Sequence, residues 1–312
     1  MKRRDFLAGT AGVLAATGLA ARPARAQLDA LTQAQFDDWL AGVRPQALQA
    51  GLTADGWDAA LQGLSPDPVV IARKAAAAET NRTVADYVQG LLNGRGQRAR
   101  AKYAALPALA QIEDRFGVPG GVLVAFWGME SDYGANIGDR DVLRAVATHG
   151  AAGSGGADWT AEFIAAARVL QSGVVAAPGL IGSYAGAMGQ TQLMPTKYLL
   201  YGVDFDGDGR IDVWKTPVDA LASAAQHLTK AVGWNRGQGW LDEVTLPPGF
   251  DLSRAEVEVT SLPIDQWASM GVRRADGAPW TGGLDPGRPD AAGGRRGPCV
   301  PRAAQLSRVR GL

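Results

Sequence analysis

Residues 183–214 read SYAGAMGQTQLMPTKYLLYGVDFDGDGRIDVW. The first part is a loop of small residues, in which Gly186 and Gly189 leave the backbone accessible. An amphipathic segment follows, and after it a run in which aspartates alternate with other residues. Neither core packing nor ordinary loop composition favours this order. The stretch therefore indicates a functional site, and its two ends indicate two kinds of binding.

The aspartate run has the spacing of an EF-hand calcium loop. Asp204, Asp206 and Asp208 stand at positions 1, 3 and 5, with Gly209 at the turn and the Arg210 carbonyl at position 7. Carboxylate and carbonyl oxygens are the ligands that Ca²⁺ prefers. The spacing predicts a structural calcium ion, and the alternative is a solvated Asp-Gly loop.

The end of that loop departs from the EF-hand pattern. Position 12 is Lys215 instead of a bidentate Glu, and Asp219 follows four residues later. Asp219 supplies the missing oxygens if the loop, taken as 204–219, is longer than the standard one. Its alternative role is the acid of a capping box, because Thr216 and Pro217 read as the start of a helix.

The loop of small residues also carries side chains of the kind that bind sugars. Ser183, Gln190, Gln192 and Tyr198 offer hydrogen-bond donors and acceptors. The alternative is that the same side chains serve the packing of a buried turn.

One acid occurs within an apolar pattern upstream of this stretch. From Pro119 the sequence predicts a helix, and Leu123, Trp127 and Glu130 fall on one of its faces. Burial raises the pKa of a carboxyl and lets a glutamate donate a proton near neutral pH. Glu130 is therefore the candidate general acid, and a salt-bridged structural glutamate is the alternative.

A second catalytic carboxylate is hard to find. Glycoside hydrolysis ordinarily uses two carboxylates about 5–10 Å apart. Asp132 would point to another face of the helix, and Asp139 and Asp141 lie in a polar loop. The two histidines, His149 and His227, stand in no motif, and with one cysteine they cannot form a zinc site.

Composition and the N-terminus indicate where the protein acts. Lys plus Arg and Asp plus Glu each number 31 among 312 residues, which argues against binding driven by nucleic-acid phosphates. Lys2, Arg3 and Arg4 precede an apolar stretch and an Ala-x-Ala cleavage site at 24–26, the pattern of a twin-arginine export signal. We expect cleavage and a periplasmic protein, the alternative being a short membrane anchor. The only cysteine is Cys299, so neither an intramolecular disulfide nor a lipid anchor is expected, and we expect a monomer.

Helical periodicity dominates the rest of the chain. We expect a signal peptide over 1–26, an N-terminal helical domain over 27–105, a catalytic core over 106–242, a small β-containing region over 243–279 and an unpacked tail over 280–312.

Local signals predict where several elements begin and end. Thr32 and Thr53 are N-caps of helices, and Pro107 interrupts a helical pattern. Other helices are expected over 81–92, from Trp159 to Leu170 and after Thr216. Short strands are expected at 243–246 and 257–259.

Three motifs occur in order: Trp-Gly-Met-Glu-Ser-Asp-Tyr-Gly at 127–134, Ala-Gly-Ala-Met-Gly-x-x-Gln-x-Met-Pro at 185–195 and Asp-Phe-x-Gly-Asp-Gly at 204–209. Together they resemble the membrane-bound lytic murein transglycosylase B family, over roughly residues 31–279. The resemblance implies a mainly α fold with a lysozyme-like core. It also implies cleavage of the β-1,4 bond between N-acetylmuramic acid and N-acetylglucosamine to give a 1,6-anhydro sugar without water.

The resemblance also implies roles for single residues. Glu130 acts first as acid to the glycosidic oxygen and then as base for the muramoyl C6 hydroxyl, which explains the missing second carboxylate. By position, Ser183 and Gln192 match residues that contact the glycan, and Met188 matches one that lines the groove. With the two aromatic candidates, the expected substrate-binding set is Ser183, Met188, Gln192, Tyr198 and Tyr133. The expected calcium ligands are Asp204, Asp206, Asp208, Arg210 and Asp219.

Two segments depart from the family pattern. Residues 149–157 stand in place of a basic pair within an aromatic-containing stretch, and 281–312 replace a Tyr-containing segment that completes the cleft. We hypothesise a reading-frame change shortly after Ala278, and a second brief one over 149–156. Resequencing the gene tests this, because an intact alternative frame must encode the missing segment.

The leading function is thus an exported lytic transglycosylase that acts on peptidoglycan glycan strands. Two alternatives remain: a lysozyme-type muramidase that uses the same glutamate with a water molecule, and a non-catalytic, calcium-stabilised glycan-binding protein. No organic cofactor is expected.

Overall fold

The computed structural model describes residues 31–75, 94–174, 179–237, 244–251, 264–277 and 279. They divide into two compact units, a helical unit of described residues up to Gly233 and a second unit that begins at Trp234. The chain is mainly helical, as predicted. The predicted signal peptide, the tail at 280–312, the helix over 81–92 and the strand at 257–259 lie outside the described residues.

The helical unit contains one short antiparallel strand pair among its helices. Strands β1 (Arg140–Asp141) and β2 (Ile181–Gly182) pair with Arg140 opposite Gly182. The helices are α3 (Gln33–Gln49), α4 (Ala54–Leu61), α5 (Pro68–Ala75), α7 (Arg95–Ala104), α8 (Ala108–Phe116), α9 (Gly120–Ser131), α10 (Val142–Ala151), α11 (Trp159–Gln171), α12 (Pro195–Tyr201), α13 (Pro217–His227) and the π-helix η1 (Leu228–Val232).

The predicted capping residues set the first helix boundaries. Thr32 forms a capping box with Gln35, in which each side chain accepts the backbone N–H of the other residue. The Thr53 hydroxyl accepts the N–H of Gly56 at the start of α4. The predicted interruption at Pro107 is confirmed, because α7 ends at Ala104 and α8 begins after the proline.

The N-terminal helices share one hydrophobic core with the central helices. The ring of Phe163 on α11 meets Trp39 of α3 and Trp57 of α4 edge-on, with ring centroids 5.7 and 5.9 Å apart. Phe36 and Val146 are buried in the same cluster. The predicted boundary near residue 105 therefore falls within the helical unit and not between the two units.

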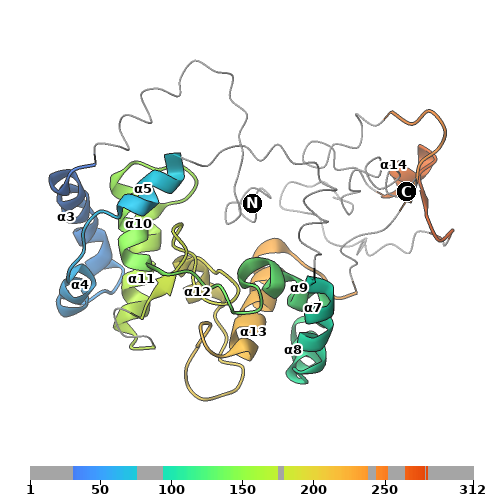
Figure 1. The fold of residues 1–312 in the computed structure, drawn as a ribbon, viewed down its shortest axis with the longest axis horizontal. Coiled ribbons are helices and arrows are strands. Elements are labelled where there is room, and N and C mark those ends of the chain that lie inside the picture. Colours follow the sequence, from blue (N-terminus) through green and yellow to red (C-terminus); the bar gives the residue numbers. More distant parts are fainter. Residues whose placement is uncertain are drawn as a thin grey trace. The chain divides into compact units, whose positions relative to one another are not determined.

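Alanines form much of the buried faces of α10, α11 and α13. Figure 1 shows α10 and α11 running side by side. Because a methyl group is the whole side chain, helices that meet through alanine can approach closely. The buried alanines on these three helices are Ala145, Ala147, Ala165, Ala166, Ala167, Ala220, Ala222, Ala224 and Ala225.

Helix α9 is held by three neighbours, α7, α8 and α13 (Figure 1). It begins after Pro119, as the sequence predicts, and buries Leu123, Val124 and Trp127. These contacts fix the end of α9, where Glu130 lies.

The second unit contains the expected small β element. Strand β3 (Val244–Thr245) pairs antiparallel with β4 (Arg273–Arg274), a partner that the sequence did not indicate. Helix α14 (Ile264–Ser269) buries Trp267 beside Phe250. In neither unit do the described residues form a helix with the length and apolar character needed to cross a membrane.

Candidate active site

Glu130 lies in the last turn of α9, at the edge of the buried face of that helix, and is half-buried. Burial raises the pKa of its carboxyl from 4.5 to about 7. Among the described residues, no group forms a hydrogen bond or ion pair with this carboxyl, so desolvation alone accounts for the shift. A carboxyl with this pKa exchanges a proton readily at neutral pH and can act as both acid and base.

The chain turns sharply where α9 ends. Three successive residues have a left-handed backbone, with φ of 51° at Asp132, 62° at Tyr133 and 84° at Gly134. The Ser131 hydroxyl donates to the carbonyl oxygen of Gln190 at 2.6 Å and accepts the N–H of Gly134 at 2.9 Å. A left-handed backbone costs a non-glycine residue about 1 kcal/mol or more, so the surroundings must hold this turn.

The acidic residues that follow Glu130 each have partners of their own. The Asp132 carboxylate accepts a hydrogen bond from Arg98 at 2.8 Å. Asp139 is paired with Arg140 at 2.8 Å, and Asp141 caps the N-terminus of α10. All three carboxylates are thus engaged in contacts with groups other than Glu130.

The loop of small residues is tightly folded. The N–H of Ser183 donates to the Ala187 carbonyl at 2.8 Å, and the Ser183 hydroxyl accepts the Ala187 N–H at 3.2 Å. Gly189 has φ of 69°, and a Cβ there would lie 2.6 Å from the carbonyl oxygen of Val213. A glycine is therefore required at position 189 by the close approach of two backbone segments.

The predicted substrate-binding residues divide into two groups. Ser183 and Gln192 are partly exposed, and Gln192 adopts φ of 50° while its side-chain amide donates to the carbonyl oxygens of Gly189 (2.9 Å) and Ile137 (3.2 Å). Met188, Tyr198 and Tyr133 are buried.

The structure corrects the expectation for Met188, one of the three buried residues. Met188 is fully enclosed in the hydrophobic core and supports the loop from inside instead of lining a groove. The Tyr198 hydroxyl donates to the Ile211 carbonyl at 2.7 Å, and burial raises its pKa. The Tyr133 hydroxyl donates to the Arg95 carbonyl at 3.1 Å. Both tyrosine hydroxyls are thus paired within the protein, and a part of these two residues in substrate binding stays a prediction.

Gln190 has a role that the sequence analysis missed. It is 4 % exposed, and its Oε1 accepts a hydrogen bond from Trp127 Nε1 at 3.0 Å. Its Nε2 donates to the Trp214 carbonyl at 3.2 Å, and its N–H donates to the Val213 carbonyl at 2.9 Å. Gln190 thus joins α9 to Val213 and Trp214, which follow the aspartate run. Its side chain is buried and paired, so it is not a sugar-binding side chain.

The aspartate loop brings three of its predicted ligands together. Carboxylate oxygens of Asp204, Asp206 and Asp219 lie within 4.8 Å of one another. Asp208 does not belong to this group, and its carboxylate accepts the N–H of Arg210 at 2.8 Å. The group consists of hard oxygen donors, which fits Ca²⁺ better than a softer metal.

Asp219 closes the loop and does not cap α13. It is 1 % exposed, and its carboxylate accepts the N–H of Phe205 at 2.8 Å and that of Asp212 at 3.0 Å. Burial raises the pKa of this carboxyl. Because Thr216 forms no side-chain cap bond, the capping-box alternative is wrong.

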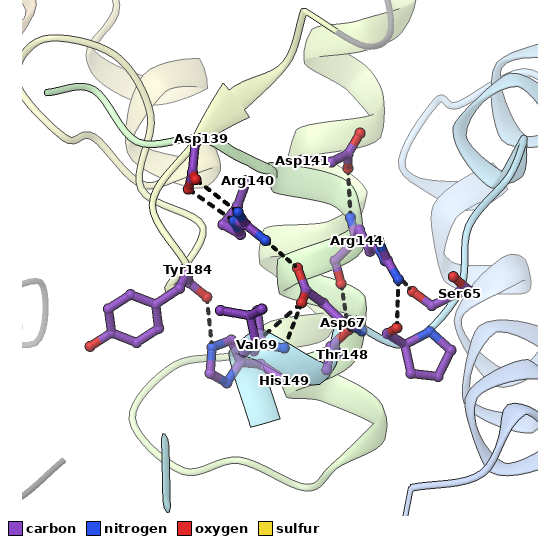
Figure 2. A network of polar contacts seen from close by, with 12 residues as sticks. Ser65, Asp67, Val69, Asp139, Arg140, Asp141, Arg144, Thr148, His149 and Tyr184 are labelled. Carbon is purple, nitrogen blue, oxygen red and sulfur yellow. Dashed lines mark hydrogen bonds and ion pairs between the residues drawn. The ribbon is translucent and has the colours of Figure 1, made fainter. Parts of the chain in front are cut away.

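A polar network joins α10 to the segment before α5 (Figure 2). The guanidinium of Arg144 donates to the carbonyls of Ser65 and Pro66, both at 2.8 Å. The N–H of buried Asp67 donates to the Thr148 hydroxyl at 2.9 Å. The network fixes the chain between α4 and α5 to α10.

Residues 149–157 are anchored by specific contacts. The His149 ring stacks on Trp159 with centroids 4.4 Å apart. Its Nδ1 lies 3.1 Å from the Ser154 hydroxyl and its Nε2 lies 3.1 Å from the Tyr184 carbonyl (Figure 2). The histidine therefore connects this segment to the loop of small residues.

Comparison with known proteins gives consistent matches. The sequence model of the transglycosylase SLT domain family matches residues 35–295 of this chain. The matched range extends beyond Ala278. Membrane-bound lytic murein transglycosylase B of Escherichia coli (strain K12) is 39% identical over 178 residues, which are 53% of this chain and 45% of that protein. The chain thus spans less than half the length of this curated relative.

Two solved structures of SltB3 from Pseudomonas aeruginosa are also similar. SltB3 in complex with NAG-NAM-pentapeptide has 41% sequence identity to this chain and a TM-score of 0.68. The alignment covers 84% of this chain and 68% of the SltB3 chain. SltB3 in complex with NAG-anhNAM-pentapeptide has 40% sequence identity and a TM-score of 0.70, and the alignment covers 86% of this chain and 69% of the SltB3 chain.

Proposed function

The chain belongs to the transglycosylase SLT domain family, and on this premise we propose that it is a lytic transglycosylase of peptidoglycan. The proposed reaction breaks the β-1,4 bond between N-acetylmuramic acid and N-acetylglucosamine and leaves a 1,6-anhydromuramoyl end. The observation that carries the proposal is the Glu130 carboxyl, half-buried and with a pKa of about 7, without a partner carboxylate among the acids that follow it.

A single carboxyl suffices for this reaction because it works twice. Protonated Glu130 donates its proton to the glycosidic oxygen as the bond from C1 to that oxygen breaks. The C6 hydroxyl of the muramoyl residue then attacks C1, and its proton passes to the Glu130 carboxylate. The glutamate ends in its starting form, and no water is consumed.

The relatives support the substrate class. SltB3 was solved with two peptidoglycan fragments, one of which contains an anhydro sugar. We extend this substrate to the present chain, with Ser183 and Gln192 as the side chains that contact the glycan because both remain partly exposed beside the folded loop.

Digestion of purified peptidoglycan tests the function. We expect mass spectrometry to find muropeptides with 1,6-anhydro ends, and Glu130→Gln to release none. Reducing muramic acid ends would instead identify a muramidase. Binding to the glycan without any cleavage would identify a non-catalytic binder.

We also propose that the aspartate loop holds a structural Ca²⁺. Asp204, Asp206 and Asp219 would supply carboxylate oxygens, and the ion would neutralise charges that otherwise repel one another. We expect Ca²⁺ to raise the melting temperature and a chelator to lower it. Asp206→Asn should abolish that response, and an unchanged melting temperature of the wild-type protein on chelation would contradict the proposal.

The proposed place of action is the periplasm, where peptidoglycan is accessible. The twin-arginine pattern at Arg3 and Arg4 supports it. Cell fractionation should find the mature chain in the periplasm, and an Arg3→Lys, Arg4→Lys variant should remain in the cytoplasm. Equal export of both proteins would contradict this route.

A further inference from the structure

We propose that Asp132 is a positioning residue for the catalytic acid, because it couples the turn that follows Glu130 to Arg98 and Arg95 of α7. The inference rests on the proposed function of Glu130. It concerns helix α7, however, which contributes no group to the proposed reaction and lies outside the helix that carries Glu130.

The turn needs support from outside. Asp132 ends α9 with φ of 51° and ψ of 49°, and its N–H bonds back to the carbonyl of Gly128. Tyr133 is also left-handed, which is unfavourable for a bulky side chain. Glu130 lies two residues before this strained segment, so any relaxation of the turn changes the direction in which its carboxyl points.

Two arginines of α7 meet the Asp132 carboxylate. Arg98 Nη1 donates to its Oδ2 at 2.8 Å, and Arg95 Nε lies 3.8 Å from its Oδ1. Oδ1 is buried and receives no hydrogen bond from any described residue. A buried carboxylate oxygen without a donor is unfavourable, so the two positive charges are needed to offset it.

Apolar burial does not explain how α7 stays against α9, because the helix has no buried side chain. Besides the Tyr103 ring, which lies against Gly120, its contacts include two cation–π contacts. The Arg98 guanidinium lies 5.7 Å from the centroid of the Tyr133 ring, and the Lys102 ammonium lies 5.4 Å from that of Trp127. The ion pairs at Asp132 are therefore part of the attachment, together with the hydrogen bond that the Tyr133 hydroxyl donates to the Arg95 carbonyl.

The expected consequence concerns geometry more than stability. Partly exposed ion pairs add little to the free energy of unfolding, about 0–1 kcal/mol. A catalytic group displaced by about 1 Å, in contrast, can lose up to about 100-fold in rate. Loss of the pair should thus reduce turnover in a protein that remains folded.

The test compares Asp132→Asn, Arg98→Gln, the double variant and Arg100→Gln on a defined soluble glycan with NAG-NAM-pentapeptide repeats. Asparagine tolerates the left-handed backbone, so Asp132→Asn removes the charge and keeps the turn sterically possible. Arg100 is an exposed arginine of the same helix and serves as the matched control. We expect kcat to fall about tenfold in both single variants with KM within about twofold, and Arg100→Gln to match the wild type. The double variant should be no worse than either single one, because both remove one interaction.

The outcomes separate this inference from the function on which it rests. Wild-type protein that forms no anhydro product contradicts both. If the wild type is active, three results contradict only the positioning role. They are an unchanged kcat in Asp132→Asn, an effect of that substitution on KM alone, and an equal loss of kcat in Arg100→Gln. If Asp132→Asn does not fold, Arg98→Lys against Arg98→Gln decides, since lysine keeps the charge and should retain more of the turnover.

Discussion

At the scale of the residue, the chemistry of Glu130 is set by the loss of water around its carboxyl. The pKa of about 7 means that the protonated acid is abundant at neutral pH and scarce above it. Because the first step of the proposed reaction needs the proton, we expect kcat/KM to fall about tenfold per pH unit above that pKa. A pH–rate profile checks this, and activity that stays constant up to pH 9 would contradict it.

Glu130→Gln has a second consequence, for stability. The folded state raises the pKa of this group above its unfolded value of about 4.5, so the wild type loses stability as the pH rises towards and through 7. Glutamine carries no such penalty. We expect the variant to be more stable than the wild type by about 1–2 kcal/mol at pH 8, after discounting for solvent exposure, and equal to it at pH 4. Denaturant unfolding at the two pH values measures the difference, and a variant less stable at pH 8 would contradict it.

The sequence predicted single residues well when the signal was local. Glu130 is recognisable as an acid in an apolar stripe within a motif. Gln190 was misassigned because its partners, Trp127 and Trp214, lie 63 and 24 residues away, and no local pattern reports such bonds. Met188 was misassigned because the backbone fold of the loop turns its side chain into the core.

At the scale of the element, α9 uses its two internal glycines differently. A Cβ on Gly128 would lie 2.7 Å from the Tyr133 ring, which itself packs edge-on against Trp127. A Cβ on Gly121 would meet nothing within 4 Å. One glycine is required by packing, and the other only weakens the helix.

This difference predicts opposite effects for the same substitution. Gly128→Ala should destabilise the protein by about 1–3 kcal/mol through overpacking. Gly121→Ala should stabilise it by about 0.5–1 kcal/mol, because alanine is the better helix former. Thermal or denaturant unfolding of the two variants measures both, and a tolerated Gly128→Ala would show that Tyr133 moves freely.

Helix boundaries were predictable because caps and prolines are local chemistry, as Thr32 and Thr53 show. The pairing of β3 with Arg273–Arg274 was not, because strands of two residues are defined by their partner and carry no periodicity.

At the scale of the whole helical unit, the N-terminal helices α3 and α4 have a core in common with the central helices α10 and α11. Arg144 strengthens this connection through the carbonyls of Ser65 and Pro66. We therefore expect the unit to unfold in one cooperative transition, although the helical pattern of the sequence suggested a boundary near residue 105.

Arg144→Gln tests this connection. Loss of its bonds to two carbonyls should lower the free energy of unfolding by about 1–3 kcal/mol and shift the whole transition. Arg168→Gln, at an exposed position on α11, is the control and should change it by less than about 0.5 kcal/mol. Calorimetry that resolves a separate N-terminal transition would support two independent domains instead.

The alanine faces of α10, α11 and α13 also bear on how the gene can diverge. Almost every replacement of a buried alanine adds volume, and overpacking costs about 1–3 kcal/mol. Losses of that size lower the amount of protein that survives in a cell several-fold, even where the catalytic residues are untouched. Selection on abundance should therefore keep these methyl-lined helix contacts nearly invariant over generations and leave sequence drift to the exposed positions.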